Sequence, residues 1–169
     1  YHSVLIHNFY QFNKFSEQLR LSQIMNVFKK VGLTKNIGIS IYEKKELKYL
    51  HKLYNFKIIQ LPFNLLNKTF DTNMLKYLKK TKHIIYVRSI FLQGLLLKNF
   101  QDLEKKFQKF KILKNIENWL KKNECSKIDL VMNDLKKNKK YIHKIVIGID
   151  NINQLKEIIS SKNKRKIFK

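Results

Sequence analysis

The sequence of 169 residues contains one cysteine, Cys125, and this scarcity excludes two kinds of small-protein architecture. A disulfide framework needs paired cysteines, and a zinc site built on cysteines needs several of them. A lone cysteine fits a reducing compartment. The five histidines include no pair with metal-ligand spacing and an acidic partner, so we predict that the protein binds no metal.

Long apolar runs are also absent. No uninterrupted run approaches the ~18 residues that a membrane-spanning helix requires, and no signal peptide precedes a small-residue cleavage site. We therefore expect a soluble, cytoplasmic protein with no membrane partner. The chain begins at Tyr1 instead of Met and enters an apolar run directly, which predicts that an N-terminal portion is missing.

Acidic residues are few: 12 Asp and Glu stand against 36 Lys and Arg, which gives a net charge of +24. Such an excess is typical of proteins that bind nucleic acid, because lysine and arginine displace counterions from phosphate backbones. Here the lysines are spread along the chain, and an AT-rich coding sequence would produce the same bias toward Lys, Asn and Ile. Only residues 162–166 are concentrated and basic, so we predict a domain at 1–161 and a basic tail at 162–169.

The apolar fraction of 44% is sufficient for a core, and much of it lies in five short runs at residues 4–6, 37–39, 58–59, 84–87 and 145–147. These runs are β-branched and mostly continuous, which is typical of strands buried on both faces of a parallel sheet. Helical spacing of apolar residues occurs between them, at residues 21–31, 47–53, 74–78, 102–123, 126–135 and 152–159.

This alternation predicts an α/β fold with right-handed crossovers and a parallel sheet. Two architectures fit: an open doubly wound sheet, and part of a (β/α)8 TIM barrel, which typically needs ~250 residues when whole. Length alone favours the open sheet. An open sheet that binds a nucleotide would carry a glycine-rich phosphate loop after its first strand, but residues 7–10 of this sequence read HNFY. This counts against the open sheet.

A polar residue follows each apolar run, and these residues are His7, Ser40, Gln60, Arg88 and Asp150. The carboxyl ends of parallel strands meet at one edge of the sheet, and ligands bind at that edge. The five residues together therefore indicate a functional site.

Five segments that include these residues resemble the aldo/keto reductases. They are residues 3–7 (SVLIH), 36–40 (NIGIS), 58–66 (IIQLPFNLL), 87–96 (VRSIFLQGLL) and 145–155 (IVIGIDNINQL). The segments occur in the order and with the spacing of the family. The resemblance implies a partial (β/α)8 barrel, with strands four to eight and their flanking helices in residues 1–161.

The resemblance also implies an activity: reduction of an aldehyde or ketone by hydride transfer, with NADP as the cofactor and NAD as the alternative form. The family uses a tetrad of Asp, Tyr, Lys and His, of which only His7 is matched here as a catalytic residue. We therefore expect that this chain is a fragment that is inactive alone. The resemblance implies that the whole enzyme binds a small carbonyl compound as its substrate.

The family's cofactor-binding positions match further residues. Ser40 and Gln60 match the positions that hydrogen-bond the nicotinamide carboxamide, and Arg88 stands where many members have a stacking Tyr. The loop around the pyrophosphate is matched by Ser89, Phe91, Gln93 and Gly94, and the start of the last helix by Gly148, Asp150, Asn151 and Gln154. Many members carry a basic residue there for the 2′-phosphate of NADP, whereas this chain has none before Lys156.

Two other hypotheses stay open. A basic nucleic-acid-associated α/β domain would explain the charge, although the reductase hypothesis does not require nucleic acid as a partner. A doubly wound sheet with a nucleotide at its switch point would explain the alternation of strands and helices.

Overall fold

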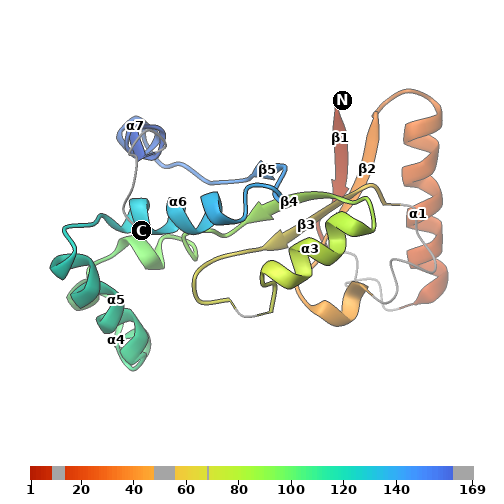
Figure 1. The fold of residues 1–169 in the computed structure, drawn as a ribbon. Helices are drawn as coiled ribbons and strands as arrows, with labels where there is room; N and C mark the ends of the chain where they lie inside the picture. The colour runs from red at the N-terminus through yellow and green to blue at the C-terminus, as the bar shows by residue number, and fades with distance from the viewer. Residues whose placement is uncertain (9–13, 48–55, 68, 162–169) are drawn as a thin grey trace. The chain divides into compact units, whose positions relative to one another are not determined.

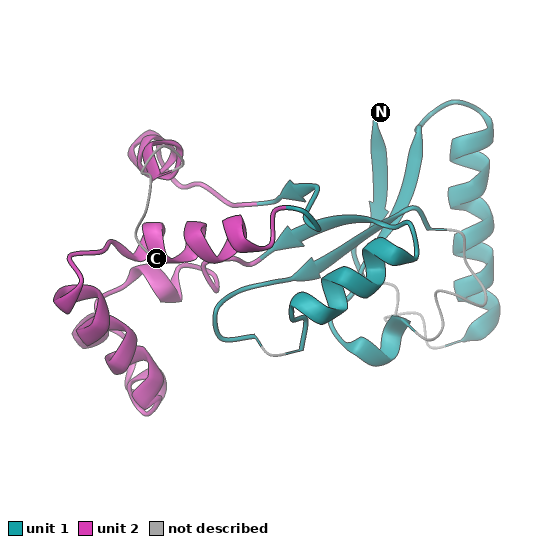
Figure 2. Cartoon of the chain, in the orientation of Figure 1, with its two compact units in different colours: residues 1–88, 140–146 teal, residues 89–139, 147–169 magenta. Residues whose placement is uncertain are grey.

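The computed structural model describes residues 1–8, 14–47, 56–67 and 69–161 (Figure 1). Unit 1 comprises residues 1–88 and 140–146, and unit 2 comprises residues 89–139 and 147–169 (Figure 2). Most of the helix expected at 47–53 and the basic tail expected at 162–169 lie outside the described residues, so both stay predictions.

Unit 1 is built on a parallel sheet. Its strands among the described residues are β1 (Ser3–Ile6), β2 (Asn36–Ser40), β3 (Ile58–Pro62), β4 (Ile84–Arg88) and β5 (Lys144–Ile145). The strands lie in the order of the sequence, and every neighbouring pair is parallel. A doubly wound sheet reverses its order at a switch point, whereas a barrel adds each strand on the same side. The fold is therefore α/β with consecutive strands of a partial (β/α)8 barrel, and the doubly wound hypothesis is wrong.

Two α-helices accompany the sheet of unit 1 in the described residues. The helix α1 (Phe15–Lys30) packs beside β2, and α3 (Thr72–Lys80) packs beside β4 (Figure 1). The apolar spacing at 21–31 falls mainly within α1. The carboxylate of Asp71 accepts a hydrogen bond from the backbone N–H of Met74 at 2.9 Å, which caps the start of α3.

The centre of the sheet is buried on both faces, as the continuous apolar runs predict. The side chains of Ile39, Ile58 and Ile59 are all 0% exposed. Gly38 lies opposite Ile58, and a Cβ at this glycine would stand 2.7 Å from the Cβ of Ile58. Only glycine permits the backbones of β2 and β3 to approach this closely.

The fifth strand is shorter than expected. The apolar run at 145–147 contributes only Ile145 to β5, although the N–H of Val146 still donates to the carbonyl of Val87 at 2.8 Å. β5 pairs with β4 alone among the described strands, and both of its residues are exposed. The pattern predicted the strand correctly but not its extent, because an edge strand has less packing to define its end.

Unit 2 is helical in its described part. It contains two short 3-10 turns, η3 (Leu95–Leu97) and η4 (Phe100–Asp102), followed by α4 (Lys105–Gln108), α5 (Lys111–Lys122), α6 (Lys127–Lys137) and α7 (Ile152–Ser161). The helix α6 packs against both α7 and η3. No helix in the described part of the chain is long and apolar enough to cross a membrane.

The helical pattern at 102–123 corresponds to two helices, because the backbone breaks between α4 and α5. Phe110 is extended at this break, with φ −84° and ψ 94°. The helix start expected at Ser126 is confirmed. The hydroxyl of Ser126 accepts a hydrogen bond from the N–H of Asp129 at 3.0 Å and so caps α6. The side chain of Asn151 caps α7 in the same way, by accepting from the N–H of Gln154 at 3.0 Å.

Candidate active site

Three predicted site residues lie at the carboxyl ends of strands in the sheet of unit 1, whereas the fourth, Gln60, was expected after its strand and lies inside it. His7 directly follows β1, Ser40 ends β2, Gln60 lies in β3 and Arg88 ends β4. Ser40 and Gln60 are partners in the parallel register, so their side chains leave the same face of the sheet. The strand ends thus gather these residues along one edge.

Arg88 forms hydrogen bonds with two consecutive residues at the end of β2. Its Nε donates to the hydroxyl of Ser40 at 3.1 Å, and its Nη2 donates to the carbonyl of Ile41 at 3.4 Å. Its guanidinium carbon also lies 4.2 Å from the centre of the Tyr42 ring, which is a cation–π contact. Arg88 therefore connects the end of β4 to the end of β2.

Tyr42 extends this network to the predicted catalytic histidine. The hydroxyl of Tyr42 lies 3.3 Å from Nε2 of His7, and the two rings meet edge to face at 6.2 Å between centroids. Sequence reasoning missed Tyr42. Its place two residues after Ser40 was a usable signal, because residues just beyond a strand end lie at the same edge.

A buried carboxylate fixes the loop that carries Tyr42. Glu46 accepts from the N–H of Tyr42 at 3.0 Å and from the N–H of Glu43 at 3.2 Å. Burial raises the pKa of Glu46 above its ordinary value of 4.5, and the two hydrogen bonds oppose that rise only in part. Glu46 therefore fixes the backbone of the loop, and Arg88 packs over the ring of Tyr42. Together these contacts limit the positions that the Tyr42 ring can adopt.

The predicted pyrophosphate loop lies in unit 2, and its backbone is unusual. Ser89, Leu92 and Gln93 have φ values of 56°, 50° and 54°, and Gly94 follows with φ 85°. Only Gly94 adopts this left-handed region without a steric cost. Non-glycine residues in this region are concentrated at functional sites, because the surrounding structure must offset their strain.

The predicted residues before α7 use their side chains to begin the helix. The N–H of Asp150 donates to the side-chain oxygen of Gln154 at 2.9 Å, and Nε2 of Gln154 donates to the Asp150 carboxylate at 3.3 Å. Asn151 serves as the cap. A Cβ at Gly148 would meet no atom within 4 Å, so local packing does not require glycine there.

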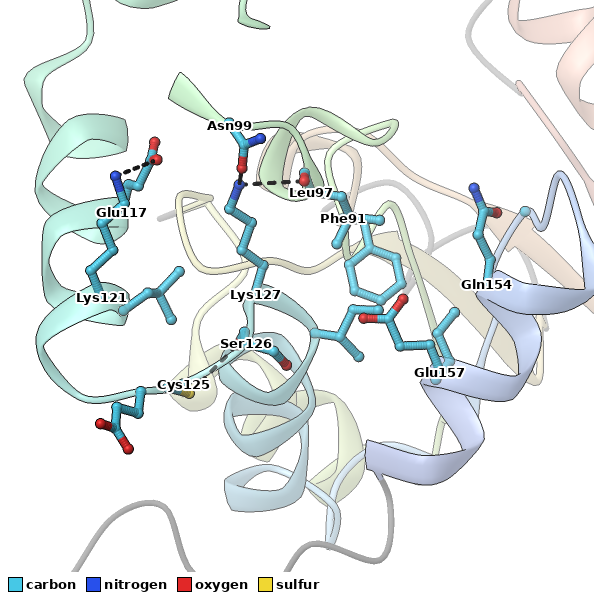
Figure 3. A pocket seen from close by; sticks show the side chains of 15 residues that line it. Phe91, Leu97, Asn99, Glu117, Lys121, Cys125, Ser126, Lys127, Gln154 and Glu157 are labelled. Atoms are coloured by element: carbon cyan, nitrogen blue, oxygen red, sulfur yellow. Dashed lines mark hydrogen bonds and ion pairs between the residues drawn. The ribbon is translucent and has the colours of Figure 1, made fainter. Parts of the chain in front are cut away.

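A cavity of about 670 Å³ lies within unit 2, and three predicted cofactor residues line it: Phe91, Gly148 and Gln154 (Figure 3). Its volume falls in the range of ~300–1,000 Å³ that small-molecule sites occupy. Sequence reasoning missed the remaining lining residues, which come from η3 and the segment after it, from α5 and the segment that joins it to α6, from the start of α6 and from α7. Their apolar spacing indicated only a helix core.

Charged residues of the cavity hold its walls in place. The Nζ of Lys127 donates to the side-chain oxygen of Asn99 at 2.8 Å (Figure 3), and it also donates to the carbonyl of Lys98 at 2.7 Å. Glu117 accepts from the N–H of Phe100 at 2.6 Å and pairs with Lys121 at 3.2 Å. The backbone hydrogen bond from Phe100 holds the pKa of Glu117 below 4.5, with Lys121 adding to the effect.

Comparison with known proteins agrees with this arrangement. A model of the aldo/keto reductase family matches residues 3–167, which is almost the whole chain. The chain belongs to the aldo/keto reductase family. No curated protein matches the sequence significantly.

Solved structures of aldo/keto reductases share the fold. The chain matches an apo aldo-keto reductase from Bacillus halodurans with a TM-score of 0.75 and 14% identity, covering 99% of this chain and 58% of that one. It matches a thermostable aldo-keto reductase solved with the inhibitor epalrestat with a TM-score of 0.65 and 16% identity, over 98% and 55% of the two chains. It matches glycerol dehydrogenase from Gluconobacter oxydans with a TM-score of 0.56 and 16% identity, over 94% and 57%. The chain thus spans less than two thirds of the length of each.

Proposed function

We propose that this chain forms part of an oxidoreductase that reduces an aldehyde or ketone with a nicotinamide dinucleotide. The observation that carries the proposal is the network at the edge of unit 1. In this network Arg88 contacts both Ser40 and Tyr42, and Tyr42 in turn contacts His7. This edge is where ligands bind in barrels of consecutive parallel strands. Family membership supports the same reaction class.

The residues present fit the cofactor that the family implies. In unit 1, the hydroxyl of Ser40 and the amide of Gln60 are groups that can hydrogen-bond a carboxamide without adding charge. In unit 2, the cavity beside Phe91, Gly148 and Gln154 has the volume and the mixed apolar and polar lining of a nucleoside site. The bound nicotinamide supplies the hydride, and the protein supplies binding and orientation.

The role of His7 in this proposal is to orient the carbonyl substrate. A ring N–H of His7 donates a hydrogen bond to the carbonyl oxygen, and this bond strengthens as negative charge develops there. Tyr42 positions the imidazole through its hydroxyl, while Arg88 holds Tyr42 through its ring. Arg88 therefore acts as a positioning residue for both Ser40 and Tyr42.

The other cofactor residues lie in unit 2. We assign Ser89, Phe91, Gln93 and Gly94 to the pyrophosphate, and Gly148, Asp150, Asn151 and Gln154 to the adenosine end. The resemblance implies NADP as the cofactor, with NAD as the alternative. No residue of this chain matches the Asp, Tyr and Lys of the family's tetrad, so we expect the 169 residues alone to bind the cofactor without turnover.

Titration with a reduced nicotinamide dinucleotide, followed by its fluorescence, tests the proposal. Saturable binding is expected, and Ser40→Ala and Gln60→Ala should each weaken it by about fivefold, the value of one lost hydrogen bond. Gln23→Ala, at an exposed position on α1, is the matched control and should leave the affinity unchanged. Absence of saturable binding would contradict the proposed function, and turnover of a carbonyl substrate by the isolated chain would contradict the expected inactivity.

A second candidate function is suggested by lysines near the amino ends of the strands of unit 1. Burial lowers the pKa of His143, and the positive charges of Lys79 and Lys57 lower it further, while a backbone hydrogen bond with Tyr141 opposes this shift in part. Such a cluster could bind a nucleic acid backbone. The affinity for a single-stranded oligonucleotide should then fall steeply with salt, and Lys57→Gln with Lys79→Gln should reduce that slope. A slope equal to that of a Lys29→Gln, Lys30→Gln control would dismiss specific binding at this cluster.

A further inference from the structure

The strand β5 has little apolar packing to keep it in the sheet of unit 1. It consists of two residues, and both are exposed. Among the described strands it pairs with β4 alone (Figure 1). After its carboxyl end, the N–H of Val146 donates to the carbonyl of Val87 at 2.8 Å. The attachment of β5 therefore depends on its hydrogen bonds to β4, including those at its amino end.

A histidine side chain replaces a backbone acceptor at that amino end. Both backbone groups of Ile85 in β4 are bonded to His143, the residue before β5. The carbonyl of Ile85 accepts from the N–H of His143 at 2.9 Å, and the N–H of Ile85 donates to Nδ1 of the His143 ring at 3.0 Å. In a regular parallel ladder this N–H would donate to a backbone carbonyl of the neighbouring strand. The ring of His143 therefore completes the pairing of β4 with β5.

This geometry determines the protonation state of the ring. A backbone N–H can only donate, so Nδ1 of His143 must accept and carries no proton, and the neutral ring has its proton on Nε2. An imidazolium carries a proton on both nitrogens, and its Nδ1 could not accept from Ile85. The pairing therefore requires a neutral His143.

The surroundings of His143 also oppose its protonation. Burial of part of the ring lowers the pKa of His143, and the positive charges of Lys79 on α3 and Lys57 before β3 lower it further. The backbone of Tyr141 opposes this shift in part. Lys79 is held at this end of the sheet, because its Nζ donates to the carbonyl of Lys140.

We propose that His143 makes the attachment of β5 pH-dependent: the neutral ring holds β5 against β4, and the protonated ring releases it. A histidine on a released strand has the ordinary pKa of 6.5, whereas the pKa of the paired form is lower. The paired form is therefore most stable above pH 6.5 and becomes less stable as the pH falls below that value. The inference does not depend on the proposed function, because it concerns unit 1 without any ligand.

Amide hydrogen exchange of the whole chain, measured by NMR at about pH 7.5 and about pH 5.5, tests this inference. Rates are expressed as protection factors, which remove the intrinsic effect of pH on exchange. The protection of the Val146 and His143 amides should fall by about tenfold at the lower pH. This is the change that a group with a pKa of 6.5 produces when only the released form binds the proton. A fall of less than about twofold would overturn the proposal.

Two matched variants assign the effect to one ring. His143→Asn keeps a side-chain acceptor near the position of Nδ1 but does not titrate, so its Val146 amide should stay protected at both pH values. His83→Asn is the control, because His83 directly precedes β4 and its Nδ1 lies 2.9 Å from the hydroxyl oxygen of Thr81. This control should show the full fall. An equal fall in the wild-type chain and in His143→Asn, or equal protection in both variants at the lower pH, would overturn the proposal.

The wild-type chain also decides the outcome by itself, should His143→Asn fail to fold. The ring signals of His143 should titrate with a pKa below 6.5, because the paired form excludes the proton from Nδ1. The protection of the Val146 amide should begin to fall at a higher pH than this titration, since the released form takes up its proton first. A measured pKa of 6.5 or above for His143 would overturn the proposal.

Discussion

The two units present their candidate site residues in different ways. In unit 1, most of the residues stand at the ends of paired strands, and the side chain of Arg88 at the end of β4 contacts Tyr42 in the segment after β2. In unit 2, they lie on a loop of left-handed residues and at the start of α7, where the side chain of Gln154 is used to begin the helix. The candidate site of unit 1 is thus formed by contacts between side chains, whereas that of unit 2 is formed by the shape of the backbone and by a cavity.

This contrast separates the two parts of the proposed reaction. Orientation of a carbonyl group requires a side-chain donor at a fixed position, which a strand end supplies because hydrogen bonds to a neighbouring strand hold its backbone. Binding of a phosphate or nucleoside requires close backbone approach and a shaped cavity, which loops and helix starts supply. Substitutions in the two units should therefore change different measurable properties of the protein.

The largest difference is expected between two glycines. Gly38→Ala should destabilise unit 1 by about 3 kcal/mol, at the upper end for overpacked cores, because its Cβ would stand 2.7 Å from both the Cβ and the carbonyl oxygen of Ile58. Gly148→Ala in unit 2 meets nothing within 4 Å and should change stability by less than about 0.5 kcal/mol. Urea denaturation of both variants measures the difference, and equal losses would show that the spacing of β2 and β3 adapts.

A smaller contrast is expected in the response to pH at Glu46 of unit 1. Its pKa is raised in the folded state, so its contribution to stability is full at and below the ordinary value of 4.5 and is lost as the pH rises through the folded pKa. Glu46→Gln, which does not ionise, should flatten this decline in denaturation midpoints measured above pH 4.5. An unchanged decline would show that Glu46 is not its source.

Glu117 of unit 2 should behave in the opposite direction. Its pKa is lowered in the folded state, so its contribution is present above pH 4.5 and is lost as the pH falls through the folded pKa. Glu117→Gln should therefore reduce the acid sensitivity of stability below pH 4.5 and leave the slope above it unchanged. Denaturation midpoints of the two glutamine variants over the same pH series test both signs together.

The smallest effect is expected for Tyr42→Phe, which removes the hydroxyl beside His7 but keeps the ring beneath Arg88. Stability should change by less than about 1 kcal/mol, because a single exposed contact is lost. The NMR signals of the His7 ring should nevertheless shift, since its Nε2 loses a partner. Tyr77→Phe on α3 is the control, and an equal shift in both variants would disprove the positioning role of Tyr42.

The strands were predictable from the sequence because burial on both faces leaves continuous β-branched runs. That pattern located four of the five strands well, and it failed at the end of β5, where an exposed edge carries no burial signal. It also placed His7, Ser40 and Arg88 at one edge, because residues at the carboxyl ends of parallel strands must lie there, whereas Gln60 lies inside β3. The length favoured an open sheet, and the family resemblance predicted a partial barrel instead.

The contacts of the site were not predictable in the same way. Nothing in the spacing of residues showed that Arg88 would cover Tyr42, because a cation–π contact depends on the path of the loop after β2. The break before Phe110 was hidden by apolar spacing that continues across it. The cavity of unit 2 was hidden as well, since residues such as Leu120 and Ile128 read as ordinary helix core.

The order of strands in unit 1 has a consequence for the exchange of amide hydrogens with solvent. The strands β2, β3 and β4 each have a neighbour on both sides, whereas β1 and β5 have one neighbour each among the described strands. Amides of the inner strands can exchange only when the sheet opens, but the outward-facing amides of β1 and β5 need no such opening. Deuterium uptake should therefore proceed from the two outer strands inward, and the backbone amides of Ile39 and Ile59 should be among the last to exchange.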